Sequence, residues 1–172
     1  MIYLREISED DLVYINKFRN NKDLQSFLVA PFRYINIETD KKWLSSYQNN
    51  RNNNIRCVIC HENDTNILGV VYLLDIDWIN RTANFGIFIS SESMRGKGYG
   101  KYATKLMLEH AFYNMNLNRV QLRVLEKNDR AIKLYKNVGF IEEGILRDAV
   151  FKENCYQNLV VMGILRSDFI GK

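Results

Sequence analysis

The most constraining feature of this sequence is a glycine-rich segment between an expected strand and the longest expected helix. Residues 94–102 read Met-Arg-Gly-Lys-Gly-Tyr-Gly-Lys-Tyr. They follow an alternating apolar strand at 82–90 and overlap the start of a helix at 98–115, and a further strand is expected at 119–125. Parallel strands need such a crossover helix between them. The sequence therefore predicts a strand–loop–helix–strand unit with two parallel strands.

The segments on either side of this unit predict the rest of one domain. The chain has 172 residues, which suits a single domain spanning 1–172. Apolar periodicity and turn signals predict strands at 2–7, 55–61, 67–75, 140–150 and 155–165, and helices after Ser8, at 37–47 and at 129–138. This order predicts an α/β fold of the α+β kind, with a mixed, mostly antiparallel sheet of about seven strands and helices on both faces.

Charge and hydropathy limit the kinds of partner. The net charge is +4, from 24 basic and 20 acidic residues without a block of like charge. This mild excess favours a small polyanionic ligand over a nucleic acid. No stretch reaches the roughly 18 consecutive apolar residues of a transmembrane helix, and the first residues lack the apolar region of a signal peptide. We therefore expect a cytoplasmic protein without a membrane or nucleic-acid partner.

The glycine-rich segment has the properties of an anion-binding loop. Glycines permit a tight turn that aims successive backbone N–H groups at one point, and the following helix adds its positive N-terminal end. Arg95, Lys97 and Lys101 add side-chain positive charge. A nucleotide P-loop is not matched, because Arg95 stands where its first glycine belongs and Tyr102 where Ser or Thr must bind magnesium.

A dinucleotide-binding reading remains open at this point. Gly98, Gly100 and Ala103 fit the pattern Gly-x-Gly-x-x-Ala, and Glu126 ends the next strand as a possible ribose partner. Against this reading, the loop lies past the midpoint of the chain, and too few residues follow it for the usual doubly wound domain. A nicotinamide-dependent oxidoreductase is therefore kept as an alternative function.

Two motifs in register connect the chain to a known family. Arg95, Gly98 and Gly100 match Arg-x-x-Gly-x-Gly, and residues 128–140 match Asn-x-x-Ala-x-x-x-Tyr-x-x-x-Gly-Phe at every fixed position. On these motifs the sequence resembles the GNAT family of N-acetyltransferases, and residues 147–169 look like the last hairpin of the branch that acetylates ribosomal-protein N-termini and spermidine. The resemblance implies an acetyl-CoA-dependent N-acetyltransferase without a metal, in which the sheet splays into a V.

The resemblance also implies roles for individual residues. Acetyl-CoA is expected between the strand at 85–89 and the strand near 119, with its pyrophosphate on the glycine loop. Tyr135 is expected to protonate the leaving thiolate. Asn84 stands where many relatives carry a glutamate base; an amide cannot take up a proton but could orient a water. The residues implied in donor binding are Ile87, Phe88, Ile89, Arg95, Gly96, Lys97, Gly98, Tyr99, Gly100, Lys101, Asn128, Ala131 and Tyr135.

The acceptor amine is less constrained by the sequence. Asn158 stands where the branch often carries Asp, and the segment 26–40 offers only Glu38 and Asp40 beside Arg33. These features favour a protein N-terminus or a small neutral-to-acidic amine, with spermidine as the alternative acceptor. A catalytically weak acyl-CoA-binding or sensing module is a further alternative, since the strand glutamate is missing. The family also makes a homodimer possible.

The remaining chemistry-bearing residues have simple structural interpretations. Cys57 and Cys60 form a Cys-x-x-Cys, but their odd spacing on a strand sends the thiols to opposite faces of the sheet. His110 falls within the apolar stripe of the long helix and is expected to pack there. Neither pattern completes a metal site or a catalytic triad.

Overall fold

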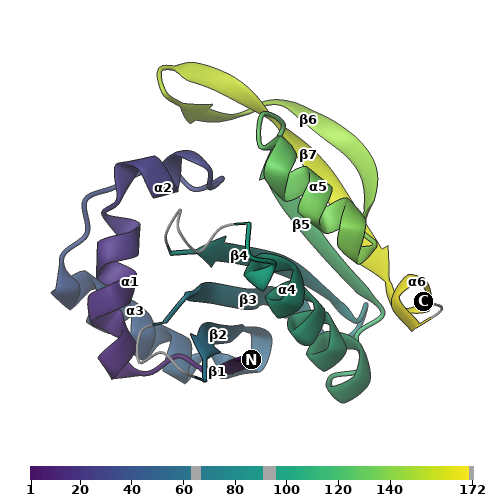
Figure 1. Cartoon of the computed structure of the whole chain (residues 1–172), viewed down its shortest axis with the longest axis horizontal. Coiled ribbons are helices and arrows are strands. Elements are labelled where there is room, and N and C mark those ends of the chain that lie inside the picture. Colours follow the sequence, from purple (N-terminus) through teal and green to yellow (C-terminus); the bar gives the residue numbers. More distant parts are fainter. Residues whose placement is uncertain (63–66, 91–95, 171–172) are drawn as a thin grey trace.

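One sheet of seven strands organises the fold (Figure 1). The computed structural model describes residues 1–62, 67–90 and 96–170. The strands are β1 (Ile2–Glu6), β2 (Ile55–His61), β3 (Gly69–Asp77), β4 (Thr82–Ile89), β5 (Arg119–Leu125), β6 (Ile141–Lys152) and β7 (Cys155–Leu165). They lie in the order β1-β2-β3-β4-β5-β7-β6, and only the central pair β4–β5 is parallel. The predicted mixed, mostly antiparallel sheet is confirmed.

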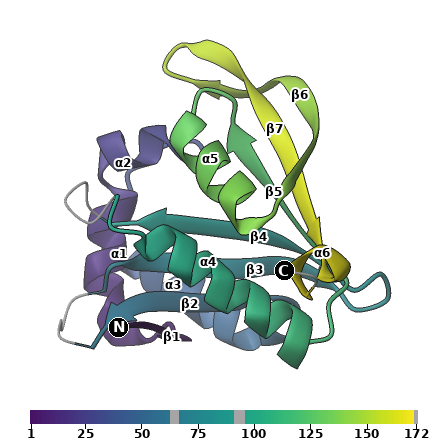
Figure 2. The same cartoon turned by 45° about the vertical axis from the view of Figure 1, so that its right-hand side comes forward.

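Helices cover both faces of this sheet. Figure 2 shows α4 (Tyr99–Glu109) and α5 (Asp129–Val138) in front of the strands and α3 (Ile37–Asn49) behind them. The remaining helical segments are η1 (Glu9–Asp11), α1 (Leu12–Arg19), α2 (Lys22–Ser26), η2 (Arg51–Asn53), the π-helical turn η4 (His110–Asn114) and α6 (Arg166–Ile170). None of the described helices has the length and hydropathy needed to cross a membrane.

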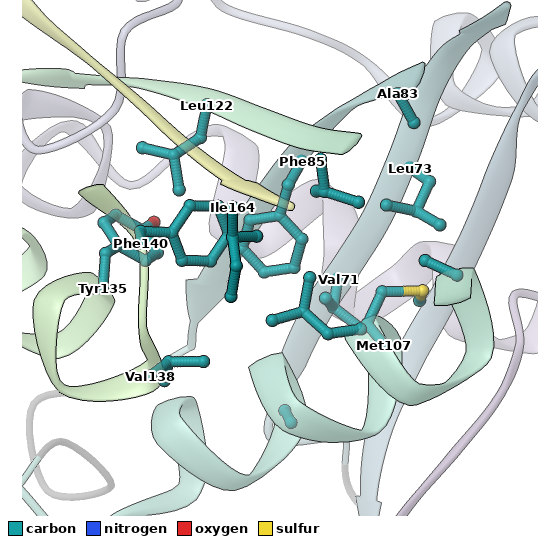
Figure 3. Close-up of a cluster of buried hydrophobic side chains, with 14 of the residues drawn as sticks. Val71, Leu73, Ala83, Phe85, Met107, Leu122, Tyr135, Val138, Phe140 and Ile164 are labelled. Carbon is teal, nitrogen blue, oxygen red and sulfur yellow. The ribbon is translucent and has the colours of Figure 1, made fainter. Parts of the chain in front are cut away.

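Each face of the sheet has its own apolar core, because successive side chains of a strand point to opposite faces. The core under α4 and α5 is the larger one, and Figure 3 shows part of it. It includes Val71, Leu73, Phe85, Met107, Leu122, Tyr135, Val138 and Phe140. The core under α1 and α3 includes Leu12, Ile15, Leu44, Tyr47, Val58 and Val70. As predicted, the two thiols separate: Cys57 packs against the first core, whereas Cys60 belongs to the second.

The sheet opens at its centre. β4 pairs with β5 only from Thr82 to Asn84, opposite residues 119–121 of β5. β4 nevertheless continues to Ile89, still paired with β3, and β5 continues to Leu125, still paired with β7. The two strands therefore separate after Asn84 and leave a wedge that widens toward the glycine loop. This is the predicted V-shaped splay.

Two short helices were not predicted from the sequence. α2 has five residues and α6 has five, too few to show a helical period. Asn20 is the C-cap residue of α1, and Asn21 is the N-cap residue of α2, so one helix ends and the next begins at this polar pair. The Asn21 side chain caps α2 by accepting from Leu24 N, and the Asn20 amide bonds both backbone groups of Ile35. The turn expected at 63–66 lies outside the described residues.

Candidate active site

The wedge between β4 and β5 exposes backbone hydrogen-bonding groups. From Phe85 to Ile89, β4 is paired on its β3 side, while the parallel ladder with β5 has already ended at Asn84. Backbone groups on the β5-facing edge therefore have no strand partner within the described chain. An extended ligand arm can pair with such an edge as an added strand. Ile87, Phe88 and Ile89 all lie on this stretch, as predicted.

The glycine loop begins helix α4 at the wide end of the wedge. Gly98 is the N-cap residue and has a φ of 82°, a left-handed conformation that L residues rarely adopt. The first N–H groups of α4 have no partner within the helix and point out of its N-terminus. Gly100 brings the start of α4 close to α5, since a Cβ there would lie 3.0 Å from Leu134 Cδ1 and this side chain would have to shift.

Several basic side chains surround this helix end. Lys97 and Lys101 are exposed, and Arg95 lies outside the described residues. Sequence reasoning did not select Arg130, whose Nη2 lies 3.9 Å from the position that a Cβ on Gly96 would take. Arg130 lies in the first turn of α5, and only its position in space shows that its charge is next to the glycine loop. Tyr99 contributes its backbone here, while its ring packs edge-on against His61, with the ring centroids 6.1 Å apart.

Helix α5 forms the other wall of the wide end. The Asn128 side chain caps it by accepting from Ala131 N at 3.1 Å, and Gly139 ends it with a φ of 120°. These two residues bound the helix predicted at 129–138. The Asn128 amide also donates to the Phe27 carbonyl at 3.3 Å, which links α5 to the segment after α2. Ala131 is partly buried against the larger core.

Tyr135 lies on α5 and reaches β4 through aromatic contacts. Its ring meets Phe85 and Phe140 with centroids 6.1 and 5.7 Å apart (Figure 3). The side chain is 7% exposed. Burial raises the pKa of the Tyr135 hydroxyl well above its ordinary value, and no hydrogen bond joins this hydroxyl to another described residue. The group is therefore a neutral O–H at physiological pH, held against the strand that borders the wedge.

Asn84 lies at the narrow end of the wedge, on the opposite face of β4 from Tyr135. Its neighbours Ala83 and Phe85 belong to the larger core, so its own side chain points the other way. The Asn84 amide donates to Asp75 Oδ2 at 3.0 Å, and Gln121 Nε2 donates to Asn84 Oδ1 at 3.0 Å. This network brings a carboxylate to the position where the sequence shows only an amide.

Asp75 was not assigned a role from the sequence, where it reads as a loop acid. It lies at a bulge where the register of β3 and β4 shifts, and its φ is 52°. The bulge re-aims its side chain toward Asn84. Asp75 is exposed, and among described residues only Asn84 donates a side-chain hydrogen bond to its carboxylate. One carboxylate oxygen is thus available at the narrow end of the wedge.

The dinucleotide alternative is not supported by this arrangement. A doubly wound domain has a mostly parallel sheet, whereas here only one pair of neighbouring strands is parallel. Glu126, the possible ribose partner, accepts from Asn158 Nδ2 at 2.9 Å. Asn158 Oδ1 in turn accepts from Asp148 N at 2.9 Å, so Asn158 ties β7 to both neighbouring segments. No group of His, Cys, Asp and Glu in the described ranges is arranged to hold a metal ion.

A splayed mixed sheet with a glycine-capped helix N-terminus beside the opening is the arrangement of an acyl-CoA-dependent acetyltransferase. Residues 2–141 match the family model of the acetyltransferase (GNAT) domain, and the chain belongs to this family. It is an N-acetyltransferase that uses acetyl-CoA as its donor and an amine as its acceptor.

Individual relatives match almost the whole chain. A spermidine N(1)-acetyltransferase of Vibrio cholerae is 29% identical over 170 residues, which cover 98% of this chain and 95% of that protein. The Escherichia coli protein of the same name is 28% identical over 173 residues, which cover 99% of this chain and 89% of that protein. The crystal structure of the Vibrio cholerae spermidine N-acetyltransferase in complex with CoA and spermine has a TM-score of 0.92, 29% identity and 98% coverage of both chains. A putative ribosomal N-acetyltransferase of Bacillus subtilis matches a shorter part: it is 29% identical over 109 residues, which cover 63% of this chain and 59% of that protein.

Proposed function

We propose that acetyl-CoA binds in the wedge between β4 and β5 and that a primary amine attacks its thioester directly. The observation that carries this proposal is the free β4 edge from Phe85 to Ile89, which ends at the N-terminus of α4. The edge suits the extended pantetheine arm, and the helix end suits the pyrophosphate. Lys97, Lys101 and Arg130 supply positive charge around the phosphates. We further propose that residues 1–172 act as one domain, since both cores share the sheet.

The two proton transfers of the proposed reaction take place on opposite faces of β4. With the donor arm in the plane of the sheet, the amine arrives on the Asn84 face, and a bond forms between its nitrogen and the acetyl carbon. The bond from that carbon to sulfur breaks, and the thiolate takes a proton from Tyr135 on the other face. The new amide nitrogen releases its extra proton to water, and Tyr135 takes a proton back from solvent. Burial raises the pKa of Tyr135, which keeps the hydroxyl protonated before the transfer, and the same dry surroundings make the departing thiolate more basic, so that it takes up the proton.

Asp75 is the proposed acceptor of the amine's proton. A protonated amine cannot attack, so it must first lose a proton to a side chain or through water. Asn84 orients a water, and the free oxygen of Asp75 takes the proton. A hydrogen-bonded pair of amide and carboxylate thus replaces the single glutamate that many GNAT relatives carry on this strand.

We propose a polyamine of the spermidine class as the acceptor. Two full-length relatives are named as spermidine acetyltransferases, and the solved relative holds spermine, which supports this class over a protein N-terminus. Asp75 adds a carboxylate that an ammonium can pair with at the narrow end of the wedge. Cytoplasmic location and a homodimer remain predictions of the sequence.

Release of free CoA thiol from acetyl-CoA distinguishes the possible acceptors. We expect thiol release to be fastest with spermidine, slower with a peptide bearing a free N-terminus, and absent without amine. Faster release with the peptide would overturn the polyamine proposal. If acetyl-CoA binds tightly but none of the tested amines causes thiol release, the protein would instead be an acyl-CoA-binding module.

Gly98→Asp tests the donor loop independently of the acceptor. The substitution forces an L residue into a φ of 82° and places a carboxylate where the pyrophosphate is expected. Calorimetric titration should show acetyl-CoA affinity falling about tenfold or more, which corresponds to about 1.4 kcal/mol. Gly98→Ala introduces backbone strain without the charge, so its affinity for acetyl-CoA should fall less. Equal affinity of Gly98→Asp and wild type would contradict the placement of the phosphates.

A further inference from the structure

Arg56 carries a positive charge that the fold does not neutralise. It lies on β2, on the face covered by α1 and α3, with its guanidinium carbon 4.9 Å from the centroid of the Trp43 ring and 5.8 Å from that of Tyr72. Its Nε is buried and has no hydrogen-bond partner. Among the ion pairs of the described residues, Arg56 takes part in none. A buried donor of this kind normally has a partner, which in proteins is often an ion or a water.

The charged groups around Arg56 are occupied elsewhere. Arg19 stacks on the same Trp43 ring, at 5.2 Å from its centroid, but is ion-paired with the buried Asp40. Tyr47 donates to Glu6 at 2.7 Å, and Glu6 is also paired with Arg51. Asp75 lies close enough to favour the charged form of Arg56, yet forms no ion pair with it, and burial still lowers the pKa of Arg56. No carboxylate of the described residues therefore forms an ion pair with this guanidinium.

A cavity of about 530 Å³ opens beside Arg56. Its wall comes from the end of α3, the turn after it and the start of β2. Five asparagines contribute to the lining, together with Trp43, Ser46 and Tyr47, and no acidic side chain does. The asparagines are Asn49, Asn50, Asn52, Asn53 and Asn54. Amide N–H groups and a guanidinium are hydrogen-bond donors, and a guanidinium matches the paired oxygens of a carboxylate or phosphate.

We propose that this cavity binds a small oxyanion, a carboxylate or a phosphate, with Arg56 as its principal ligand. Trp43, Tyr47 and Tyr72 hold the guanidinium in place through cation–π contacts and keep water from it, which strengthens its attraction for an anion. The bound anion accepts the hydrogen bond that the buried Nε lacks, and asparagine N–H groups of the rim donate to its remaining oxygens. A small oxyanion fits the cavity, and the charge of Arg56, with no carboxylate in the lining, favours an anion over a cation.

This anion site is separate from the acetyl-CoA wedge. Arg56 on β2 pairs with Tyr72 on β3, which pairs with Gly86 on β4. With neighbouring strands about 4.8 Å apart, the Arg56 backbone lies roughly 10 Å from the edge of the wedge. The Tyr72 ring fills the space between them, since it lies where a side chain on residue 86 would extend. The proposed anion site therefore lies outside the donor wedge, and Asp75, whose N–H donates to Asn54 Oδ1 of the cavity lining at 3.4 Å, lies between the two.

Tryptophan fluorescence reports directly on this cavity. The chain has two tryptophans: Trp43 lines the cavity, and Trp78 Nε1 donates to the Asn52 carbonyl at 3.0 Å. The full chain is titrated with inorganic phosphate and, separately, with succinate, at constant ionic strength and with saturating CoA. We expect a saturable change in fluorescence with at least one anion, and a stronger response to succinate than to phosphate if the ligand is a carboxylate. A response to neither would overturn the proposal.

Three variants separate a built site from general charge attraction. Arg56→Met should weaken anion binding about tenfold or more, because it removes the charged donor. Asn53→Asp places a like charge in the rim on an exposed side chain, so it should weaken binding even if Arg56→Met fails to fold. Arg51→Met removes an exposed positive charge from the same turn, outside the cavity lining, and should bind as wild type does. Equal losses in Arg51→Met and Asn53→Asp would show that only net charge matters and would refute the site.

Discussion

Tyr135→Phe is expected to lower kcat about 100-fold or more while leaving acetyl-CoA binding nearly unchanged. The substitution removes only the hydroxyl, and no described residue hydrogen-bonds to that hydroxyl. The ring contacts with Phe85 and Phe140 remain, so the fold should be retained. What is lost is the proton for the departing thiolate. Steady-state thiol release and calorimetric titration with acetyl-CoA measure the two effects separately.

The pH dependence of turnover gives a second test of this assignment. Because burial raises the pKa of Tyr135, its proton should not be lost below about pH 10, the ordinary value for tyrosine. Wild-type turnover should therefore rise with pH as the amine loses its proton, with no fall from ionisation of the acid in this range. Unchanged kcat in Tyr135→Phe would rule out tyrosine as the acid.

Matched variants show whether the loss is specific to this hydroxyl. Tyr113→Phe removes an exposed hydroxyl beside Phe169, far from β4 in sequence, and should leave kcat unchanged. Asp75→Asn keeps the shape of the Asn84 network and removes the proposed proton acceptor, so kcat/KM should fall about tenfold at neutral pH. If Asp75→Asn were as active as wild type, the amine would have to lose its proton by another route.

Features that depend on residues close together in the sequence were predictable. The Asn128 cap, the Gly139 end of α5 and the left-handed Gly98 each follow from the backbone requirements of one turn, and the structure has all three. The strands were predictable because apolar alternation is set by one buried face. The separation of Cys57 and Cys60 to opposite cores follows from the same period of two.

Features that depend on contacts distant in sequence were not predictable. Asp75 reads as a loop acid until the bulge between β3 and β4 brings it to Asn84. Arg130 becomes a neighbour of the glycine loop only when α5 packs beside α4. Arg56 is one of many basic residues in strand-like sequence, and its lack of an acidic partner is visible only in three dimensions. Such residues leave no periodic or local pattern, so the sequence contains less information about the acceptor side than about the proposed donor loop.

Lys152 is the clearest example of such a long-range contact. It ends β6 and is 7% exposed. Its Nζ donates to the carbonyls of Gln25, Leu28 and Ala30 at 2.9, 2.7 and 2.8 Å. Burial lowers the pKa of this amine, while three carbonyls match the three N–H groups of the ammonium form. With the bond from Asn128 to Phe27, this contact joins the segment after α2 to the β5–β7 half of the sheet, across the wide end of the wedge.

Lys152→Met is accordingly expected to lower the free energy of unfolding by about 2–4 kcal/mol. Methionine fills a similar volume but leaves three carbonyls without their donor. Lys127→Met is the matched control: Lys127, in the connection between β5 and α5, is exposed and paired with the exposed Glu153 of the β6–β7 turn, so its loss should cost less than about 1 kcal/mol. Urea denaturation measures both values.

Lys152→Met should also accelerate amide exchange in the segment that Lys152 holds and raise KM for the amine. Amide hydrogen exchange across residues 25–30 should accelerate, since Lys152 no longer holds their carbonyls. Because this segment crosses the wide end of the wedge, KM for the amine should rise more than the affinity for acetyl-CoA falls. Lys152→Arg keeps the charge, but its planar donors do not match three carbonyls around one nitrogen, so it should restore only part of the stability. A Lys152→Met protein as stable as wild type, with unchanged exchange at 25–30, would show that other contacts hold this segment across the wedge.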